Sequence, residues 1–139
     1  MTYKFTDTPT KHPLTFAELK VWIATKYGFD NTDKITIKDG EIGWWGTDGI
    51  HAVGVWFPIN PTELSFFFDS LEIVGSLDYD PNDGRSYATF EAFIDHWYGG
   101  DVDLLKVGDF PTRESALVAL YDKCFEIAEE KLRKEQPND

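Results

Sequence analysis

The chain is poor in the features that mark secreted and membrane proteins. Cys124 is the only cysteine among its 139 residues, so an internal disulfide and a disulfide-stapled secreted scaffold are excluded. No apolar run is long enough to span a bilayer, and the first residues contain no apolar signal-peptide core. These absences lead us to expect a cytoplasmic protein.

Positive charge is also scarce. Thirteen Lys and Arg residues stand against 25 Asp and Glu residues, which gives a net charge of −12. Residues 60–110 hold only Arg85 and Lys106 against eleven acidic residues, a net charge of −9 for this segment. A field of this sign repels phosphate backbones, so we expect no direct nucleic-acid binding. The charge suits a basic protein partner, or it keeps an aromatic-rich domain in solution.

Motifs of known catalytic chemistry are missing as well. The sequence has no phosphate-binding loop, no dinucleotide fingerprint, no His-Glu-x-x-His and no Gly-x-Ser-x-Gly. The three histidines lie far apart without the spacing of metal ligands, and Cys124 falls on an apolar helical stripe as a small hydrophobic residue would. We therefore expect no enzymatic activity, no cofactor and no metal.

Apolar and aromatic residues, in contrast, are plentiful. They make up 42% and 16% of the chain, enough for a packed core in a protein of this size. Because there is no linker, repeat or low-complexity segment, we expect residues 1–139 to form a single α+β domain. In the predicted fold an antiparallel three- to four-stranded β-meander is packed by an N-terminal helix, a middle helix and a long C-terminal helix.

Local signals place the N-terminal helix. Thr15 and Glu18 have the spacing of a capping box, which predicts a helix that begins at Thr15. Gly28 is placed to end this helix. One apolar stripe runs along it, made of Phe16, Leu19, Ile23 and Tyr27.

Two Asp-Gly pairs, at 39–40 and 48–49, predict the hairpin turns of the meander. Two-residue turns at both places would define strands over 34–38, 41–46 and 50–57. Counting back from the turns predicts four apolar pairs on one face of the sheet, namely Ile37 with Ile42, Ile35 with Trp44, Trp44 with Val53 and Ile42 with Val55.

Residues 60–97 carry mixed signals. Residues 60–80 fit a helical stripe in their first half and strand alternation in their second, and we favour a short helix to about Asp69 followed by a strand over 71–79. Thr89 then opens a predicted middle helix that ends at Gly99-Gly100. Its apolar face consists of Phe90, Phe93, Ile94 and Trp97.

The last helix is predicted to begin after Thr112 and to fray over about 130–139, where the sequence becomes polar. Its opening, Phe110-Pro-Thr-Arg-Glu-Ser-Ala-Leu117, resembles the closing segment of small uncharacterised phage and prophage proteins. Their pattern is aromatic-x-Thr-x-Glu-x-Ala-Leu. The resemblance covers about a fifth of the chain and implies an origin on a mobile element. It implies no activity and no functional residues.

The second face of the meander is the candidate binding surface. The predicted register sets Gly43 beside Gly54, with Trp45 and Trp56 at either end of this glycine floor. Indoles around a flat floor suit a planar ligand or a protruding partner side chain. The alternative is that the two indoles are simply part of the core.

The function suggested by these observations is a non-enzymatic protein-binding module, of the kind used by phages as an inhibitor or adaptor. A small-molecule-binding protein that uses the Trp and Gly face is the first alternative. An acidic DNA mimic is the second, and it requires the eleven acidic residues of 60–110 on one continuous face. Homodimerisation by strand addition is also open to a short sheet with free edges.

Overall fold

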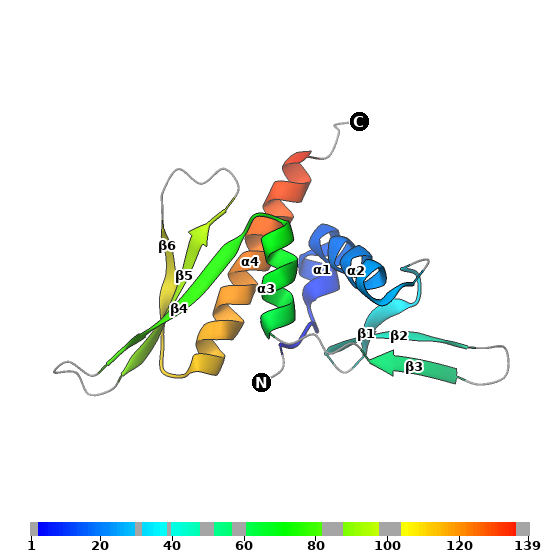
Figure 1. Cartoon of the computed structure of the whole chain (residues 1–139), viewed down its shortest axis with the longest axis horizontal. Coiled ribbons are helices and arrows are strands. Elements are labelled where there is room, and N and C mark those ends of the chain that lie inside the picture. Colours follow the sequence, from blue (N-terminus) through cyan, green and yellow to red (C-terminus); the bar gives the residue numbers. More distant parts are fainter. Residues whose placement is uncertain are drawn as a thin grey trace. The chain divides into compact units, whose positions relative to one another are not determined.

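A computed structural model describes residues 3–29, 32–38, 40–47, 52–56, 61–81, 88–97 and 104–135, and at several strand positions, including Trp45 and Trp56, it describes the backbone alone. These residues form four helices and six strands (Figure 1). The fold is α+β, as predicted, with an N-terminal, a middle and a long C-terminal helix. Contacts group the chain into two units, Thr2–Glu63 and Leu64–Asp139, and each is described by itself.

The N-terminal helix of the first unit, α2 (Pro13–Tyr27), begins earlier than predicted. Pro13 takes the first helical position, where its fixed φ suits the helix and its missing N–H costs nothing. Thr15 is therefore fully buried inside the first turn, and the N-cap is His12. The predicted cap at Thr15 is wrong. Gly28 ends the helix in the left-handed conformation, with φ at 78°, as predicted.

The segment ahead of α2 is tied to the first hairpin. It contains a single helical turn, α1 (Thr8–Lys11), which the sequence analysis does not predict. The Phe5 amide donates to the Gly40 carbonyl at 2.9 Å, and the rings of Tyr3 and Phe5 meet edge to face. Both rings are buried, so this segment adds aromatic surface to the core of the first unit.

Three antiparallel strands, β1 (Ile35–Lys38), β2 (Glu41–Thr47) and β3 (Ala52–Trp56), form the meander in that order. The first predicted register is confirmed, since Ile35 pairs with Trp44 and Ile37 with Ile42. The intervening Gly40 has φ at 79°, the positive value that a tight hairpin turn demands of its second residue.

The register of the second hairpin differs from the prediction. Trp44 pairs with Val55 rather than Val53, and Thr47 pairs with Ala52. Residues 48–51 therefore connect the paired ends, where a two-residue turn at 48–49 was predicted. Because side chains alternate along a strand, this shift by two residues keeps every residue on its predicted face and changes only its partner.

The favoured interpretation of residues 60–80 is confirmed. A helix, α3 (Pro61–Ser70), is followed by a strand, β4 (Val74–Asp80). The turn between them uses Glu72 at φ 62°, and the Ile73 amide returns to the Phe68 carbonyl at 3.0 Å. This tight turn starts the second sheet, so β4 does not join the meander.

The predicted helix over 89–97 is wrong, since this segment forms the strand β5 (Thr89–His96). The only middle helix among the described residues is α3. In β5 the alternate residues Ala92 and Ile94 are fully buried, whereas Asp95 is exposed. Aromatic and β-branched residues suit a central strand, and pairing on both edges overrides the helical spacing of Phe90, Phe93 and Ile94.

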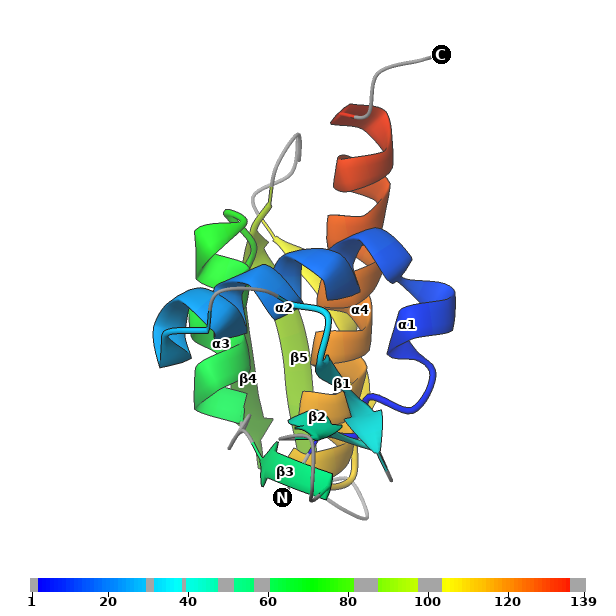
Figure 2. The same ribbon diagram turned by 90° about the vertical axis from the view of Figure 1, so that its right-hand side faces the viewer.

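The second sheet has the order β4-β5-β6 and packs against the C-terminal helix. The last strand is β6 (Leu105–Phe110), and α4 (Arg113–Glu135) runs across all three strands (Figures 1 and 2). The buried Phe68 ring stacks on Tyr121 with centroids 6.1 Å apart and meets Phe125 edge to face at 5.0 Å. The helices α3 and α4 therefore share one aromatic cluster.

The start of α4 is as predicted. The Thr112 hydroxyl accepts a hydrogen bond from the Ser115 amide at 3.0 Å, and the Ser115 hydroxyl accepts one from the Thr112 amide at 3.3 Å. This reciprocal pair satisfies amides that the first turn of a helix leaves without a backbone partner.

The end of α4 is longer than expected, because the helix continues to Glu135 and residues 130–135 are not frayed. Two ion pairs at i,i+4 spacing support it, Glu129 with Arg133 at 3.4 Å and Glu130 with Lys134 at 3.1 Å. In both pairs the acidic residue precedes the basic one, which is the favourable orientation in the helix dipole. Residues 136–139 lie outside the described residues.

Gly75 allows α4 to approach the sheet. A Cβ atom at this position would lie 2.7 Å from Leu120 Cδ1 and 3.2 Å from the Phe93 carbonyl oxygen. We expect Gly75→Ala to raise the helix from the sheet and to lower the free energy of unfolding by about 1–3 kcal/mol. Urea unfolding followed by circular dichroism measures this loss. Ser76→Ala is the matched control, and equal losses in the two variants would contradict the close-packing account.

Candidate functional site

The predicted Trp and Gly surface has a different arrangement from the one expected. Gly43 pairs with Trp56 and Trp45 pairs with Gly54, so each tryptophan stands opposite a glycine and the two glycines are not neighbours. Gly43 is buried and Gly54 is exposed. The side chains of Trp45 and Trp56 lie outside the described atoms. A binding role for these four residues stays a prediction.

The opposite face of the same hairpin contains ordered aromatic contacts. Trp44 stacks on Phe29, with ring centroids 6.3 Å apart and an interplanar angle of 7°. Its strand partner Ile35 and its neighbour on the same face, Ile42, are both buried. This face therefore belongs to the core of the first unit, as the apolar pairing predicts.

Cys124, His12 and His96 lie on three different elements of the chain. Cys124 is buried against the aromatic core, and desolvation raises the pKa of its thiol to about 12, so it is a thiol at neutral pH. His12 lies at the start of α2, and His96 is exposed at the end of β5. His51 lies outside the described residues. This geometry agrees with the interpretation of Cys124 as a small hydrophobic residue.

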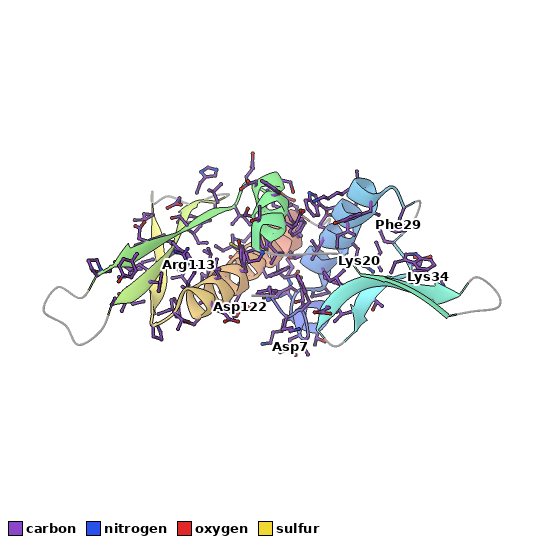
Figure 3. The ribbon with its side chains drawn as sticks, turned by 60° about the horizontal axis from the view of Figure 1, so that its bottom comes forward. Asp7, Lys20, Phe29, Lys34, Arg113 and Asp122 are labelled. Carbon is purple, nitrogen blue, oxygen red and sulfur yellow. The ribbon has the colours of Figure 1, made fainter. Side chains whose placement is uncertain are left out.

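A row of three aromatic residues crosses the second sheet at one end. Tyr79 on β4 pairs with Phe90 on β5, and Phe90 pairs with Phe110 on β6. The Tyr79 and Phe90 rings have centroids 5.3 Å apart, and the Arg113 guanidinium lies 5.3 Å from the Phe90 centroid. Arg113 is labelled in Figure 3. Tyr79 is 61% exposed, and the Phe90 and Phe110 rings are half-buried. We call these three residues the aromatic row.

The aromatic row lies on the face of the sheet that α4 covers. Gly75 approaches Leu120 of α4, and Tyr79 is four residues further along the same strand, so both point to the same side. Arg113, the first residue of α4, reaches Phe90 from this side. Since α4 begins here, its first turn leaves the outer end of the aromatic row accessible at Tyr79.

The neighbouring row across the strands is acidic and lies on the opposite face. Asp78 pairs with Glu91, and Glu91 pairs with Asp109, so three carboxylates line up across the sheet. We call them the acidic row. Like charges directly opposite each other destabilise a sheet unless a cation lies between them. Lys106 supplies one, at 3.0 Å from Asp109 and 3.2 Å from Glu91.

Lys106 neutralises charge only towards the β6 end of the acidic row. Hydrogen bonds to Asp109 and then to Glu91 raise the pKa of Lys106, so the ammonium keeps its proton. Asp78, at the β4 end, is exposed and has no ion-pair partner in the described parts of the chain. On the β4 side the row therefore ends in a carboxylate with which no cation of the described residues pairs.

Among the remaining acidic residues of 60–110, Asp80 shares this face, because it lies two residues after Asp78 on β4, and Asp95 is exposed near the end of β5. The other described ones lie outside the sheet. Asp69 lies on α3, and Glu63, also on α3, pairs with Lys26. Glu72 lies in the turn before β4. Three more, Asp83, Asp101 and Asp103, lie outside the described residues. The described part of this segment thus divides its negative charge between a helix, a turn and a sheet face.

Neither row is predicted from the sequence, because the spacing of apolar residues over 89–97 favours a helix where the strand β5 forms. Their members are separated by ten or more residues, and only the pairing of β4, β5 and β6 brings them together. A signal was present, since Asp78-Tyr79, Phe90-Glu91 and Asp109-Phe110 are three adjacent acidic and aromatic pairs. Three strands aligned on such pairs would form one aromatic and one acidic row.

Neither a metal-binding cluster nor a membrane-spanning helix is present in the described residues. No cluster of three or more His, Cys, Asp and Glu side chains there could hold a metal ion. No helix there has the length and apolar character needed to cross a membrane.

Comparison with known proteins adds no relative. No protein-family model, no curated protein and no solved structure matches the chain.

The buried Cys124 thiol predicts a loss of stability at high pH. Burial raises the pKa of Cys124 from 9.0 to about 12, and burial likewise raises the pKa of Tyr121 from 10.0 to about 12. Below pH 9 the folded and unfolded chains both keep these protons. Between pH 9 and 12 only the unfolded chain releases them, so the free energy of unfolding falls as pH rises.

Cys124→Ala isolates the contribution of the thiol. Its free energy of unfolding should fall less steeply over this range, by up to about 1.4 kcal/mol per pH unit, because one titrating group is gone. Urea titrations at several pH values measure the two slopes, and the variant's lower starting stability does not affect the comparison. Identical slopes would contradict a buried, neutral thiol.

Proposed function

We propose that the chain is a protein-binding module without catalytic activity of its own, which engages a positively charged partner protein through the aromatic and acidic rows of its second sheet. The observation that carries the proposal is the end of both rows on β4, in an exposed aromatic ring and an exposed carboxylate. Exposed Tyr and Trp side chains are enriched among the residues that dominate binding energy. An acidic surface speeds association with a basic partner and disfavours acidic ones.

Features of the sequence support a more specific role for this protein-binding module. The resemblance of Phe110–Leu117 to phage and prophage proteins supports an inhibitor or adaptor that acts on a host protein. The absence of catalytic motifs from the sequence supports binding over chemistry, since such a protein acts by occupying a surface. The net charge of −12 keeps the free protein soluble until it meets its partner.

Two alternatives compete with this proposal. A small-molecule site on the meander is supported by the pairing of Trp45 with Gly54, whose backbone is exposed, although Gly43 opposite Trp56 is buried. Acidic mimicry of DNA has less support, because Lys106 neutralises part of the acidic row and Lys26 pairs with Glu63.

Affinity capture with matched variants tests the proposed function. The wild-type chain is expected to retain a basic protein from bacterial lysate, and added salt should weaken the complex because surface charges are screened. Tyr79→Ala should lower the amount retained by roughly tenfold, as expected for loss of an exposed aromatic anchor. Phe66→Ala is the control, since Phe66 is a 54% exposed aromatic residue on α3.

The outcomes separate the candidates. Equal retention by wild type and Tyr79→Ala would remove the aromatic row from the interface. A complex that high salt abolishes and that Tyr79→Ala leaves unchanged would favour acidic mimicry. If nothing is retained, the protein-binding proposal fails and the Trp and Gly face becomes the leading site, with extraction of bound metabolites from the purified protein as the next step.

A further inference from the structure

The outer edge of β4 supports an inference that goes beyond the proposed function. β4 pairs with β5 on one side, and no strand in the described residues pairs with it on the other. An edge strand points alternate backbone N–H and C=O groups away from its sheet, ready to pair with another extended chain. β4 has seven residues, which is long enough for an added strand to form a continuous ladder.

An added strand would extend both rows. Its residue opposite Tyr79 would join the aromatic row, on the face of α4, where Tyr79 exposes 61% of its surface. The adjacent residue would stand opposite Asp78 and join the acidic row, on the other face. Because successive side chains alternate between faces, one strand would present an apolar residue to one row and a neighbouring residue to the other.

The charges define the chemistry of that neighbouring residue. On the β6 side Lys106 lies against Glu91 and Asp109, and the β4 side has no such cation in the described residues. β4 carries Asp78 and Asp80 and no basic residue, whereas Lys106 and Asp109 balance each other on β6. A lysine or arginine on an added strand would complete the acidic row as Lys106 does at its other end.

We propose that β4 binds an extended segment of the partner protein as a fourth strand of the sheet, and that this segment alternates basic and apolar side chains. The inference rests on the proposed function and adds the mode of recognition. Backbone hydrogen bonds to β4 supply affinity, while Asp78 and Tyr79 select the side chains.

A second copy of this chain fits the edge less well. Antiparallel pairing of two β4 strands over their full length would place Asp78 of one copy diagonally across from Asp78 of the other, which brings two like charges close together. Acidic side chains on an edge strand protect it from self-association. The same carboxylates attract a basic strand, so the edge is selective as well as protected.

Peptide binding to the ¹⁵N-labelled full chain tests the inference. The probe is a peptide of alternating lysine and valine, blocked at both ends and matched in length to the seven residues of β4. A second peptide replaces lysine by glutamate. A third keeps the lysine and valine side chains but is methylated at every backbone nitrogen, which removes the donors needed for a ladder. Binding is followed through amide chemical shifts and fluorescence anisotropy.

The expected result has three parts. The lysine–valine peptide shifts the amides of Val74–Asp80 more than those of β6, and its affinity falls with salt. The glutamate peptide and the methylated peptide each bind at least about tenfold more weakly. Asp78→Lys weakens the lysine–valine peptide by at least about tenfold, whereas Glu135→Lys, a charge reversal at an exposed position at the end of α4, leaves it unchanged. Thermal melts verify that both variants are folded.

Other outcomes overturn the inference. Equal binding of the methylated peptide would mean attraction by charge alone, without strand pairing. Shifts confined to β6, or no binding of the lysine–valine peptide, would exclude the β4 edge. Shifts of the β4 amides that grow with the concentration of the chain itself would identify a second copy as the occupant.

A competition experiment between the peptide and a captured partner distinguishes failure of this inference from failure of the proposed function. If affinity capture retains a partner and the peptide neither binds β4 nor displaces that partner, the edge inference fails and the protein-binding function stands. If capture retains nothing, the proposed function fails, and binding of the peptide to β4 as described would then show only that this edge accepts a basic strand.

Discussion

The close packing of α4 on the second sheet is the constraint on which the other features of this unit depend. Gly75 lets Leu120 approach the backbone of β4, and the Phe68, Tyr121 and Phe125 rings join α3 to α4 above the strands. With one face of the sheet covered, the polar residues of β4, β5 and β6 must occupy the other. Alternation along each strand then produces an acidic row on the opposite face, directly beside an aromatic row on the face that α4 covers.

The position at which α4 begins limits how much of the sheet it covers. The helix begins at Arg113, with two residues between it and the end of β6, and Thr112 caps its first turn. The guanidinium of Arg113 lies over Phe90, while Tyr79 on the edge strand keeps most of its surface in solvent. A single packing arrangement therefore buries the centre of the sheet and leaves one aromatic ring and one carboxylate at the same edge. The interaction surface that we propose is a consequence of how the core is built.

Local signals in the sequence predicted the parts of the fold that depend on neighbouring residues. Gly28 ends α2, Thr112 caps α4, and the first Asp-Gly pair specifies the register of β1 and β2. Predictions failed where residues distant in the sequence determine the local structure. Residues 89–97 have helical spacing but lie between two strands, and Pro13 starts a helix before the capping box that the sequence offers. The second Asp-Gly pair predicted the correct face for the residues of β2 and β3 but the wrong cross-strand partners. The length of the turn decides which residues pair, whereas the alternation of side chains decides the face, so a shift by two residues changes only the partners.

The candidate site shows the same limit. The Trp and Gly face was inferred from one hairpin, and its pairing changed when the register moved by two residues. The aromatic and acidic rows require three strands in correct register, which no single segment encodes.

Site-specific photo-cross-linking tests the central claim, that the β4 edge contacts a partner protein, most directly. A benzoylphenylalanine in place of Tyr79 is compared with one in place of Phe66 after irradiation in bacterial lysate. The account predicts one dominant adduct with a basic protein from position 79, with cross-linked residues in an extended segment, and no such adduct from position 66. The same adducts from both positions, or none from position 79, would contradict it.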